Sequence, residues 1–193
     1  MSLPQPFSIF GEWLAEAQTR EPNNPSAMSV ATVGPGGRPS LRMVLLRGFD
    51  ARGFVFYTNM ESHKGHELRE NAQVALCFHW KSMDRQVRIE GRAALVDAAE
   101  ADAYYHSRPR DSQISAWASR QSEILPSREV LEARVEKYSA LYAVGKVPRP
   151  PFWSGYRVVP DLIELWEERP FRLHDRHEWR REGENWTETL RYP

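Results

Sequence analysis

The chain has almost no cysteine: Cys77, in the run VALCFHW, is the only one among 193 residues. A single cysteine excludes an intrachain disulfide and is typical of proteins from reducing compartments. The chain also lacks an apolar run of the roughly 20 residues that a membrane-spanning helix needs. Its first residues, MSLPQPFSIF, lack the basic stretch of a secretory signal. These absences predict a cytoplasmic protein with no membrane partner, in which Cys77 is a small buried apolar residue.

Neither sign of charge prevails in the chain. Lys and Arg total 26, as do Asp and Glu, so the formal net charge is zero. This balance removes the overall positive field with which proteins bind the phosphates of nucleic acid, so any anion site must be a local cluster. Hydrophobic residues make up 41% of the chain. That content and the chain length predict a single folded domain over residues 1–193.

Motifs of several common enzyme classes are missing. The histidines show no H-x-x-x-H or Cys/His spacing, so no metal site is expected. There is no G-x-G-x-x-G, no P-loop and no G-x-S-x-G. Their absence argues against a doubly wound nucleotide fold and against a serine hydrolase.

Turn residues divide the chain into short strand-like runs with helices between them. Alternating apolar, β-branched and aromatic residues predict strands over 28–33, 39–50, 54–59, 74–80, 85–96, 156–168, 171–182 and 185–193. Apolar residues at helical spacing predict helices over 7–19, 62–71, 97–107, 111–117 and from Ser127 to Gly145. Asp97, and Asp111 or Ser112, are the expected N-caps. The pattern favours a mainly β (α+β) fold, a closed β-barrel with helices at its edge.

The stretch YYHSRPRDS gathers groups that suit an anion. Arg108 and Arg110 flank Pro109, Tyr104 lies one helical turn earlier, and Ser112 starts the next predicted helix. Arginines, hydroxyls and a helix N-terminus are what a phosphate monoester prefers. A solvated corner between two helices would give the same pattern, and the stretch alone leaves both interpretations open.

A second candidate is Arg42, which stands inside the apolar strand LRMVLLR. It needs a partner because an unpaired buried cation is costly. A structural salt bridge and an anionic ligand are both open. Arg47 has the opposite strand parity, so the two arginines can contact one ligand only if the strand twists or bulges.

Polar side chains share strand faces at two further places. Gln86 lies on the polar face of RQVRIEGRA, which is either the wet side of an antiparallel sheet or a carboxamide facing a heterocycle. Arg172, His174 and Arg176 in RLHDR are expected on one strand face. Three potentially cationic side chains in a row favour a ligand-binding face.

Eight stretches together resemble the pyridoxamine 5′-phosphate oxidase family. In chain order they are RMVLLR, FYTN, SHKGHELREN, RQVRIEGRA, YYHSRPRDSQISAWASRQS, FWSGYRV, IELW and RLHDR, and the resemblance runs from about Phe7 to Pro193. The resemblance implies an FMN-binding split β-barrel and a homodimer with two FMN molecules at the subunit interface. The strands over about 156–193 would complete the barrel and the active site.

The family pattern also implies which residues bind what. FMN would be held by Arg42, Met43, Val44, Leu45, Arg47, Tyr57, Thr58, His63, Lys64, Gln86, Gln121, Ser122, Trp166 and Arg176. The substrate phosphate would contact Arg47, Tyr104, Arg108 and Ser112. Arg172 and His174 would contact the substrate ring as the catalytic pair.

The implied reaction is the oxidation of pyridoxine 5′-phosphate or pyridoxamine 5′-phosphate to pyridoxal 5′-phosphate. Hydride would pass from C4′ to the flavin, and O2 would accept the electrons to give H2O2, with NH3 released from the amine. One alternative is a related FMN oxidase acting on another ring, as in the phenazine pathway. Another is a non-catalytic flavin- or pyridoxal-phosphate-binding module. The retained RPRDS stretch disfavours the first, and the pair Arg172 and His174 disfavours the second.

The chain departs from the family pattern at two positions. Arg47 stands where many members have lysine, which keeps the charge and changes its geometry. His63 precedes Lys64 where an arginine often stands, which predicts a weaker or pH-dependent contact with the FMN phosphate.

Overall fold

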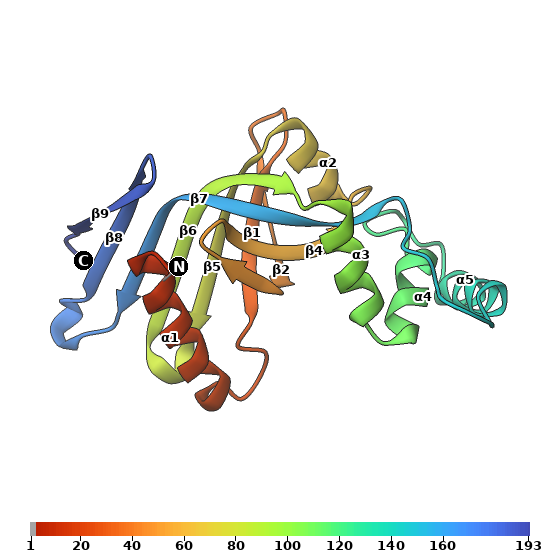
Figure 1. Cartoon of the computed structure of the whole chain (residues 1–193), viewed down its shortest axis with the longest axis horizontal. Helices are drawn as coiled ribbons and strands as arrows, with labels where there is room; N and C mark the ends of the chain where they lie inside the picture. Colours follow the sequence, from red (N-terminus) through yellow and green to blue (C-terminus); the bar gives the residue numbers. More distant parts are fainter. Residues whose placement is uncertain (1–2) are drawn as a thin grey trace.

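The computed structural model describes residues 3–193, which form one antiparallel sheet with helices at its edges (Figure 1). The strands are β1 (Ala27–Val33), β2 (Pro39–Leu45), β3 (Gly48–Asp50), β4 (Gly53–Asn59), β5 (Gln73–Trp80), β6 (Arg85–Leu95), β7 (Trp153–Glu167), β8 (Asp175–Glu182) and β9 (Asn185–Leu190). The helices are α1 (Gln5–Arg20), α2 (His63–Glu70), α3 (Ala98–Ser107), α4 (Arg110–Ala118) and α5 (Arg128–Leu141), with 3-10 turns η1 (Lys81–Met83) and η2 (Pro170–Arg172). The expected mainly β fold with flanking helices is confirmed.

The sheet curls without closing. Its hydrogen-bonded order within the described residues is β2-β1-β5-β6-β7-β4-β3, with β8 added to β7 and β9 to β8. Because β2 and β3 end this order without pairing to each other, the barrel is split, as the family resemblance implies. The closed barrel suggested by the strand pattern alone is wrong.

β7 is the longest strand and connects the parts of the sheet. The first residues of β7 pair with β4 and its last residues pair with β8, and the whole of β6 pairs with β7. A bulge between Glu90 and Gly91 bends the β6–β7 ladder. Gly91 is needed there, because a Cβ atom would lie 2.1 Å from the carbonyl oxygen of Val159.

The main core lies between α1 and the sheet. α1 buries Phe7, Phe10, Leu14 and Ala17 along one face, as its helical spacing predicts. The ring of Phe10 lies 5.0 Å from that of Phe54 on β4 and 5.2 Å from that of Phe78 on β5. Each such buried aromatic contributes about 2–3 kcal/mol of hydrophobic stabilisation, and α1 thereby fixes the curvature of the strands beneath it.

The helices α3, α4 and α5 form a smaller layer near the Trp153 end of β7 (Figure 1). Asp97 caps α3 as expected, since its Oδ1 accepts from the backbone N–H of Glu100 at 2.7 Å. The start predicted for the next helix is one residue late: α4 begins at Arg110 with Pro109 as its N-cap. Pro109 makes no side-chain cap hydrogen bond, and its non-helical backbone (φ −52°, ψ 145°) leads the chain into the helix. α5 ends at Leu141, four residues before the predicted stop at Gly145.

The predicted strand 171–182 begins late. β8 starts at Asp175, and Phe171 and Arg172 have left-handed φ angles of 60° and 61°. Pro170 has no N–H for a ladder, and the left-handed turn after it points the chain out of the sheet. The prediction that Arg172, His174 and Arg176 share one strand face is therefore wrong, because only Arg176 lies on β8.

Candidate functional site

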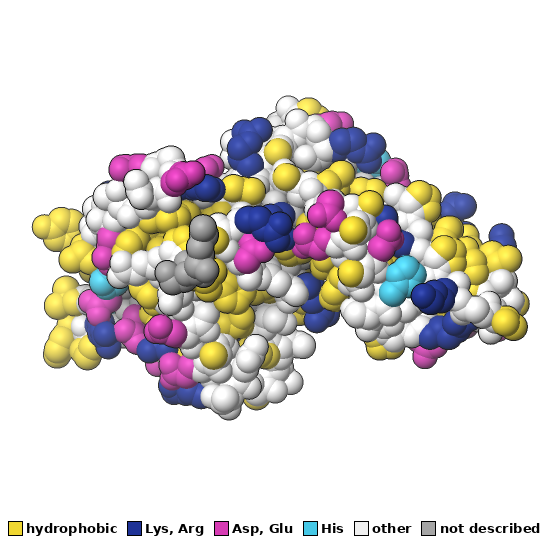
Figure 2. All heavy atoms as spheres, in the orientation of Figure 1, with side chains coloured by type: hydrophobic (Ala, Val, Ile, Leu, Met, Phe, Trp, Pro, Cys, Tyr) yellow, Lys and Arg dark blue, Asp and Glu magenta, His cyan; other side chains and the backbone are white. Residues whose placement is uncertain are grey.

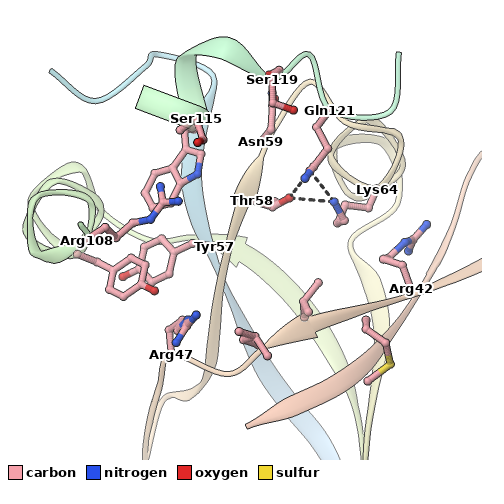
Figure 3. A pocket seen from close by; sticks show the side chains of 16 residues that line it. Arg42, Arg47, Tyr57, Thr58, Asn59, Lys64, Arg108, Ser115, Ser119 and Gln121 are labelled. Carbon is pink, nitrogen blue, oxygen red and sulfur yellow. Dashed lines mark hydrogen bonds between the residues drawn. The ribbon is translucent and has the colours of Figure 1, made fainter. Parts of the chain in front are cut away.

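An open cleft of about 510 Å³ lies where β2 and β4 meet the helical layer (Figure 3). Its walls come from six separate parts of the chain: β2 and the residues after it, β4, α2, the α3–α4 segment, the α4–α5 loop and the start of β7. The lining residues are Arg42, Met43, Val44, Leu45, Arg47, Tyr57, Thr58, Asn59, Lys64, Tyr104, Arg108, Ser115, Ala116, Ser119, Gln121 and Trp153. Among the described residues none of these is acidic, so the cleft suits an anionic ligand.

A break in the chain direction brings Arg42 and Arg47 to the same cleft. β2 ends at Leu45, and the backbone N–H of Arg47 donates to the carbonyl of Val55 on β4 at 2.8 Å. The strand predicted over 39–50 is thus two strands with a crossing between them. Arg42 and Arg47 have opposite strand parity and could reach one ligand only if the strand did not continue straight. This break in the strand allows both side chains to line the cleft.

One end of the cleft is built around Lys64, the second residue of α2. Its Nζ donates to Gln121 Oε1 at 2.8 Å, to Thr58 Oγ1 at 3.0 Å and to Ser62 Oγ at 3.2 Å. Figure 3 shows Lys64, Thr58 and Gln121 converging from α2, β4 and the α4–α5 loop. All three partners are neutral. Burial, aided by the charge of Arg42, lowers the pKa of Lys64 to about 8.

The same end contains Arg42, for which the sequence left a structural salt bridge and an anionic ligand open; the structure shows the salt bridge. Its side chain lines the cleft and also forms an ion pair with Glu67, Nη2 to Oε2, at 3.3 Å. It donates further to the hydroxyls of Thr32 and Ser40. Arg42 is therefore held in place and paired with a carboxylate, while Lys64 has no carboxylate partner in the part of the chain that the structure describes.

The other end is an aromatic wall with a cation against it. Tyr57 and Tyr104 stack with centroids 3.9 Å apart, and Trp153 stacks on Tyr57 at 5.2 Å. The guanidinium carbon of Arg108 lies 4.9 Å from the Trp153 ring. Its Nη1 is buried with no hydrogen-bond partner within the described chain, and burial lowers the pKa of Arg108, with Arg47 nearby adding to the effect. An unpartnered buried guanidinium N–H is costly unless a ligand accepts from it.

Burial, with the charge of Glu100 adding to it, raises the pKa of Tyr57 to about 12. The phenol is therefore a neutral hydrogen-bonding group near pH 7 and adds no negative charge to the cleft.

Some predicted site residues lie outside the cleft wall. His63 does not line the cleft; its Nε2 lies 3.3 Å from Glu67 Oε1, and its side chain is 66% exposed. Ser122, at a left-handed φ of 74°, and Ser112 are not among the lining residues. Arg110 is structural, because it donates to the backbone carbonyls of Tyr142 and Gly145.

Five lining residues were not predicted: Asn59, Ser115, Ala116, Ser119 and Trp153. Asn59 ends β4 and Trp153 begins β7, while Ser115 and Ser119 are four residues apart across the end of α4. That spacing puts both serines on one face. It could have indicated them only if the end of α4 had been placed at Ala118 instead of Trp117.

The remaining predicted residues form a second group, which we call the β6–β8 row. Gln86, Trp166 and Arg176 are neighbours across β6, β7 and β8, and the His174 ring lies 4.7 Å from that of Trp166. Trp166 is nearly a whole 15-residue strand away from Trp153 in the cleft, about 40 Å if β7 ran straight. Within one chain, the predicted site residues therefore lie in two separate places, the cleft and the β6–β8 row.

Buried charge is matched differently in the β6–β8 row. Glu164, 2% exposed, accepts from Arg88 Nη2 at 2.8 Å and from Arg176 Nε at 2.9 Å. Burial alone would raise the pKa of Glu164, but the two arginines hold it below its ordinary value. Arg172 is exposed at the end of η2.

Residues 3–193 contain no group of three or more His, Cys, Asp or Glu side chains that could hold a metal ion. No helix in this part of the chain has the length and apolar character needed to cross a membrane. Cys77 is partly buried, and burial raises the pKa of its thiol, in keeping with an apolar packing role.

Residues 14–142 match the family model described as pyridoxamine 5′-phosphate oxidase, and residues 153–193 match that of the pyridoxine 5′-phosphate oxidase C-terminal dimerisation region. A relative in Rhodospirillum rubrum, named pyridoxine/pyridoxamine 5′-phosphate oxidase, is 60% identical, covering 97% of this chain and 96% of its own. One of the same name in Rhizobium meliloti is 56% identical, covering 98% and 93%.

Two solved structures share the fold. PhzG from Burkholderia lata, in complex with tetrahydrophenazine-1-carboxylic acid, superposes with a TM-score of 0.91 at 34% identity and covers 97% of this chain and 92% of its own. A pyridoxamine 5′-phosphate oxidase-related, FMN-binding protein from Nostoc punctiforme superposes with a TM-score of 0.80 over the whole of both chains. At 17% identity, the second similarity concerns the fold alone.

Proposed function

The chain belongs to the pyridoxamine 5′-phosphate oxidase family, and we propose that its cleft binds FMN and a phosphorylated vitamin B6 form side by side. The enzyme oxidises pyridoxine 5′-phosphate or pyridoxamine 5′-phosphate to pyridoxal 5′-phosphate, with O2 as electron acceptor, H2O2 as product and NH3 released from the amine. The observation that carries this proposal is the guanidinium of Arg108, whose Nη1 has no hydrogen-bond partner among residues 3–193, in a cleft with no acidic residue on its described wall.

The residues at the Lys64 end fit the phosphate of FMN. That phosphate carries close to two negative charges near pH 7, and Lys64 is a buried cation whose present partners are all neutral. The N-terminus of α2 adds a favourable field. We assign FMN to the cleft residues Arg42, Met43, Val44, Leu45, Arg47, Tyr57, Thr58, Lys64 and Gln121.

The other end suits the substrate phosphate. Arg108, Arg47 and Tyr104 line the cleft there, and the guanidinium of Arg108 suits a phosphate oxygen as acceptor. Ser112 is the member of the predicted grip that lies outside the wall. The stack of Tyr57, Tyr104 and Trp153 limits access of water on that side.

FMN supplies the acceptor for the hydrogen and two electrons that leave the substrate carbon. The chain binds and orients: clamping the phosphate end of the substrate converts remote binding energy into alignment of the reacting carbon. We propose that Arg172 and His174 position the ring and handle the proton at the substrate oxygen or amine.

A homodimer reconciles the two groups of predicted residues. Arg172, His174, Trp166 and Arg176 lie on or beside the C-terminal segment that matches a dimerisation region, and the cleft of the same chain lies at the other end of β7. We propose that the β6–β8 row of one subunit completes the cleft of its partner. The exposed Phe171 and Leu173 beside this row, 93% and 67% exposed, suit such a contact.

Oxidation of another ring is the competing function, since the PhzG structure has a different ligand. The unpartnered Arg108 and the higher identity to the vitamin B6 enzymes disfavour it.

The discriminating experiment compares pyridoxine 5′-phosphate with unphosphorylated pyridoxine by aldehyde formation and O2 uptake. We expect turnover of the phosphate ester and a kcat/KM for pyridoxine lower by about a hundredfold or more, given the strength of charge-assisted phosphate contacts. Equal turnover of the two, or turnover of neither, would contradict the proposal.

A further inference from the structure

Glu67 is a buried carboxylate directly behind the cleft wall. It stands on α2, three residues after Lys64, and is 6% exposed. Its Oε2 accepts from Thr32 Oγ1 at 2.5 Å, from Ser40 Oγ at 2.6 Å and from Arg42 Nη2 at 3.3 Å. Glu67 itself does not line the cleft, so it acts through the residues that it contacts.

The hydrogen-bond directions in this cluster follow from proton counting. A hydroxyl has one proton to donate and two lone pairs that accept. Thr32 and Ser40 each donate to Glu67, which leaves their lone pairs free to accept from Nη1 and Nη2 of Arg42. The carboxylate thus orients both hydroxyls toward the guanidinium. Burial raises the pKa of Glu67, but the bonds from Ser40 and Thr32 outweigh it and keep the group ionised.

Arg42 is held from several sides and can still contact a ligand. Its Nη1 also donates to the carbonyl of Val30 at 3.2 Å, and its side chain stays 21% exposed and lines the cleft. A long side chain fixed before binding does not lose its rotamer freedom when the ligand arrives. Lys64 has no such support from a carboxylate.

We propose that Glu67 is a positioning residue that presents the guanidinium of Arg42 to the phosphate of FMN. The proposal rests on the proposed function, because it concerns how tightly the cleft holds this anion. It makes Thr32 and Ser40 relays that carry the effect of the carboxylate to Arg42.

The test is the affinity of the apoprotein for FMN and for riboflavin, which lacks the phosphate, measured by quenching of flavin fluorescence. Glu67→Gln keeps the shape and removes the charge that orients both hydroxyls. We expect its Kd for FMN to rise about fivefold or more, the cost of reordering one arginine, with the Kd for riboflavin changed less than twofold. Ser40→Ala removes one relay at a partly exposed site and should give a smaller loss of the same selectivity.

Two comparisons separate positioning from a merely structural role. In an Arg42→Ala background, Glu67→Gln should not weaken FMN binding further, because the residue through which it acts is gone. The control is Glu100→Gln, since Glu100 joins a helix to a strand through Arg157 at 2.8 Å and does not line the cleft. It should leave the ratio of the two Kd values unchanged.

The outcomes are distinct. Equal weakening of FMN and riboflavin by Glu67→Gln, unchanged binding, or tighter binding of FMN would each overturn the positioning role while leaving the proposed function in place. A wild-type apoprotein that binds neither flavin would overturn both.

Discussion

The cleft and the β6–β8 row both place arginines in partly buried surroundings, but they balance the charge differently. In the row, Arg88 and Arg176 share the carboxylate of Glu164. In the cleft, Arg108 has a buried N–H without a partner and Lys64 has only neutral ones. Burying a cation is tolerated when an anion accompanies it. The row carries its own anion. In the cleft Glu67 pairs with Arg42, but Arg108 and Lys64 leave that role to ligands.

This difference also suggests how the two regions cooperate. A row whose charge is already matched can present Trp166, Arg176 and the adjacent His174 to a neighbour without a large desolvation penalty. The two cations of the cleft that lack an anion within the described chain, Arg108 and Lys64, select the anionic ligands. The three predictions that follow test this division, from the largest expected effect to the smallest.

The largest effect is expected when defects in the two regions are combined between subunits. Arg108→Ala damages the cleft, and Arg172→Ala with His174→Ala damages the row, so each protein alone should be nearly inactive. Random mixing by co-expression or refolding makes half of the dimers mixed, and each mixed dimer has one intact site. About a quarter of wild-type activity should therefore return, because a two-fold symmetric dimer pairs each cleft with the other row.

The matched control for this complementation mixes Arg108→Ala with Arg47→Ala, two changes in the same cleft, and should recover nothing. Recovery absent from both mixtures would show that cleft and row act within one chain, and the comparison between the two regions would lose its functional meaning.

The second effect concerns two arginines on either side of Pro109. Arg108→Ala should raise KM for pyridoxine 5′-phosphate about a hundredfold, since a charge-assisted hydrogen bond to phosphate is worth about 2–3 kcal/mol, with the FMN content unchanged. Arg110→Ala is the control, because Arg110 donates to the carbonyls of Tyr142 and Gly145 instead. It should lower the melting temperature and leave KM near the wild-type value. Loss of FMN from Arg108→Ala would show that the arginine belongs to the cofactor end.

The same two arginines illustrate how far the sequence alone could go. Both belonged to the candidate anion-binding stretch, and nothing in SRPRDS distinguishes them. Arg108 packs against Trp153 of β7, whereas Arg110 donates to carbonyls in the segment after α5. Local signals were more informative. Alternation indicated β5 and β6, and Asp97 marked the start of α3, since these depend on neighbours in the chain.

The errors arose where backbone geometry departs from residue preference. Phe171 and Arg172 adopt left-handed φ angles that non-glycine residues rarely show, so a strand was the natural prediction for RLHDR. The role of Glu67 was missed for another reason. Within SHKGHELREN it looks like an ordinary helical glutamate, and its contacts with Thr32, Ser40 and Arg42 depend on how α2 packs on β1 and β2.

The smallest expected effect is the pH dependence of FMN binding, which tests whether Lys64 lacks an anion until the cofactor arrives. Its pKa of about 8 in the free protein, set by burial, lies below the ordinary lysine value of 10.5. The folded apoprotein therefore holds fewer protons than the unfolded chain between these values, so its stability rises as pH increases through about 8.

An anionic phosphate raises this pKa again, which makes binding of FMN take up a proton above pH 8. The affinity for FMN should be level from pH 6.5 to 7.5 and fall by about tenfold between pH 8 and 9.5, as measured by flavin fluorescence. Riboflavin should show no such fall, and Lys64→Arg should abolish it, because a guanidinium does not lose its proton in this range. A level curve for the wild-type protein up to pH 9.5 would mean that Lys64 is not beside the phosphate. The contrast between the row, whose arginines pair with Glu164, and the cleft, where Lys64 and Arg108 await an anionic ligand, would then rest on Arg108 alone.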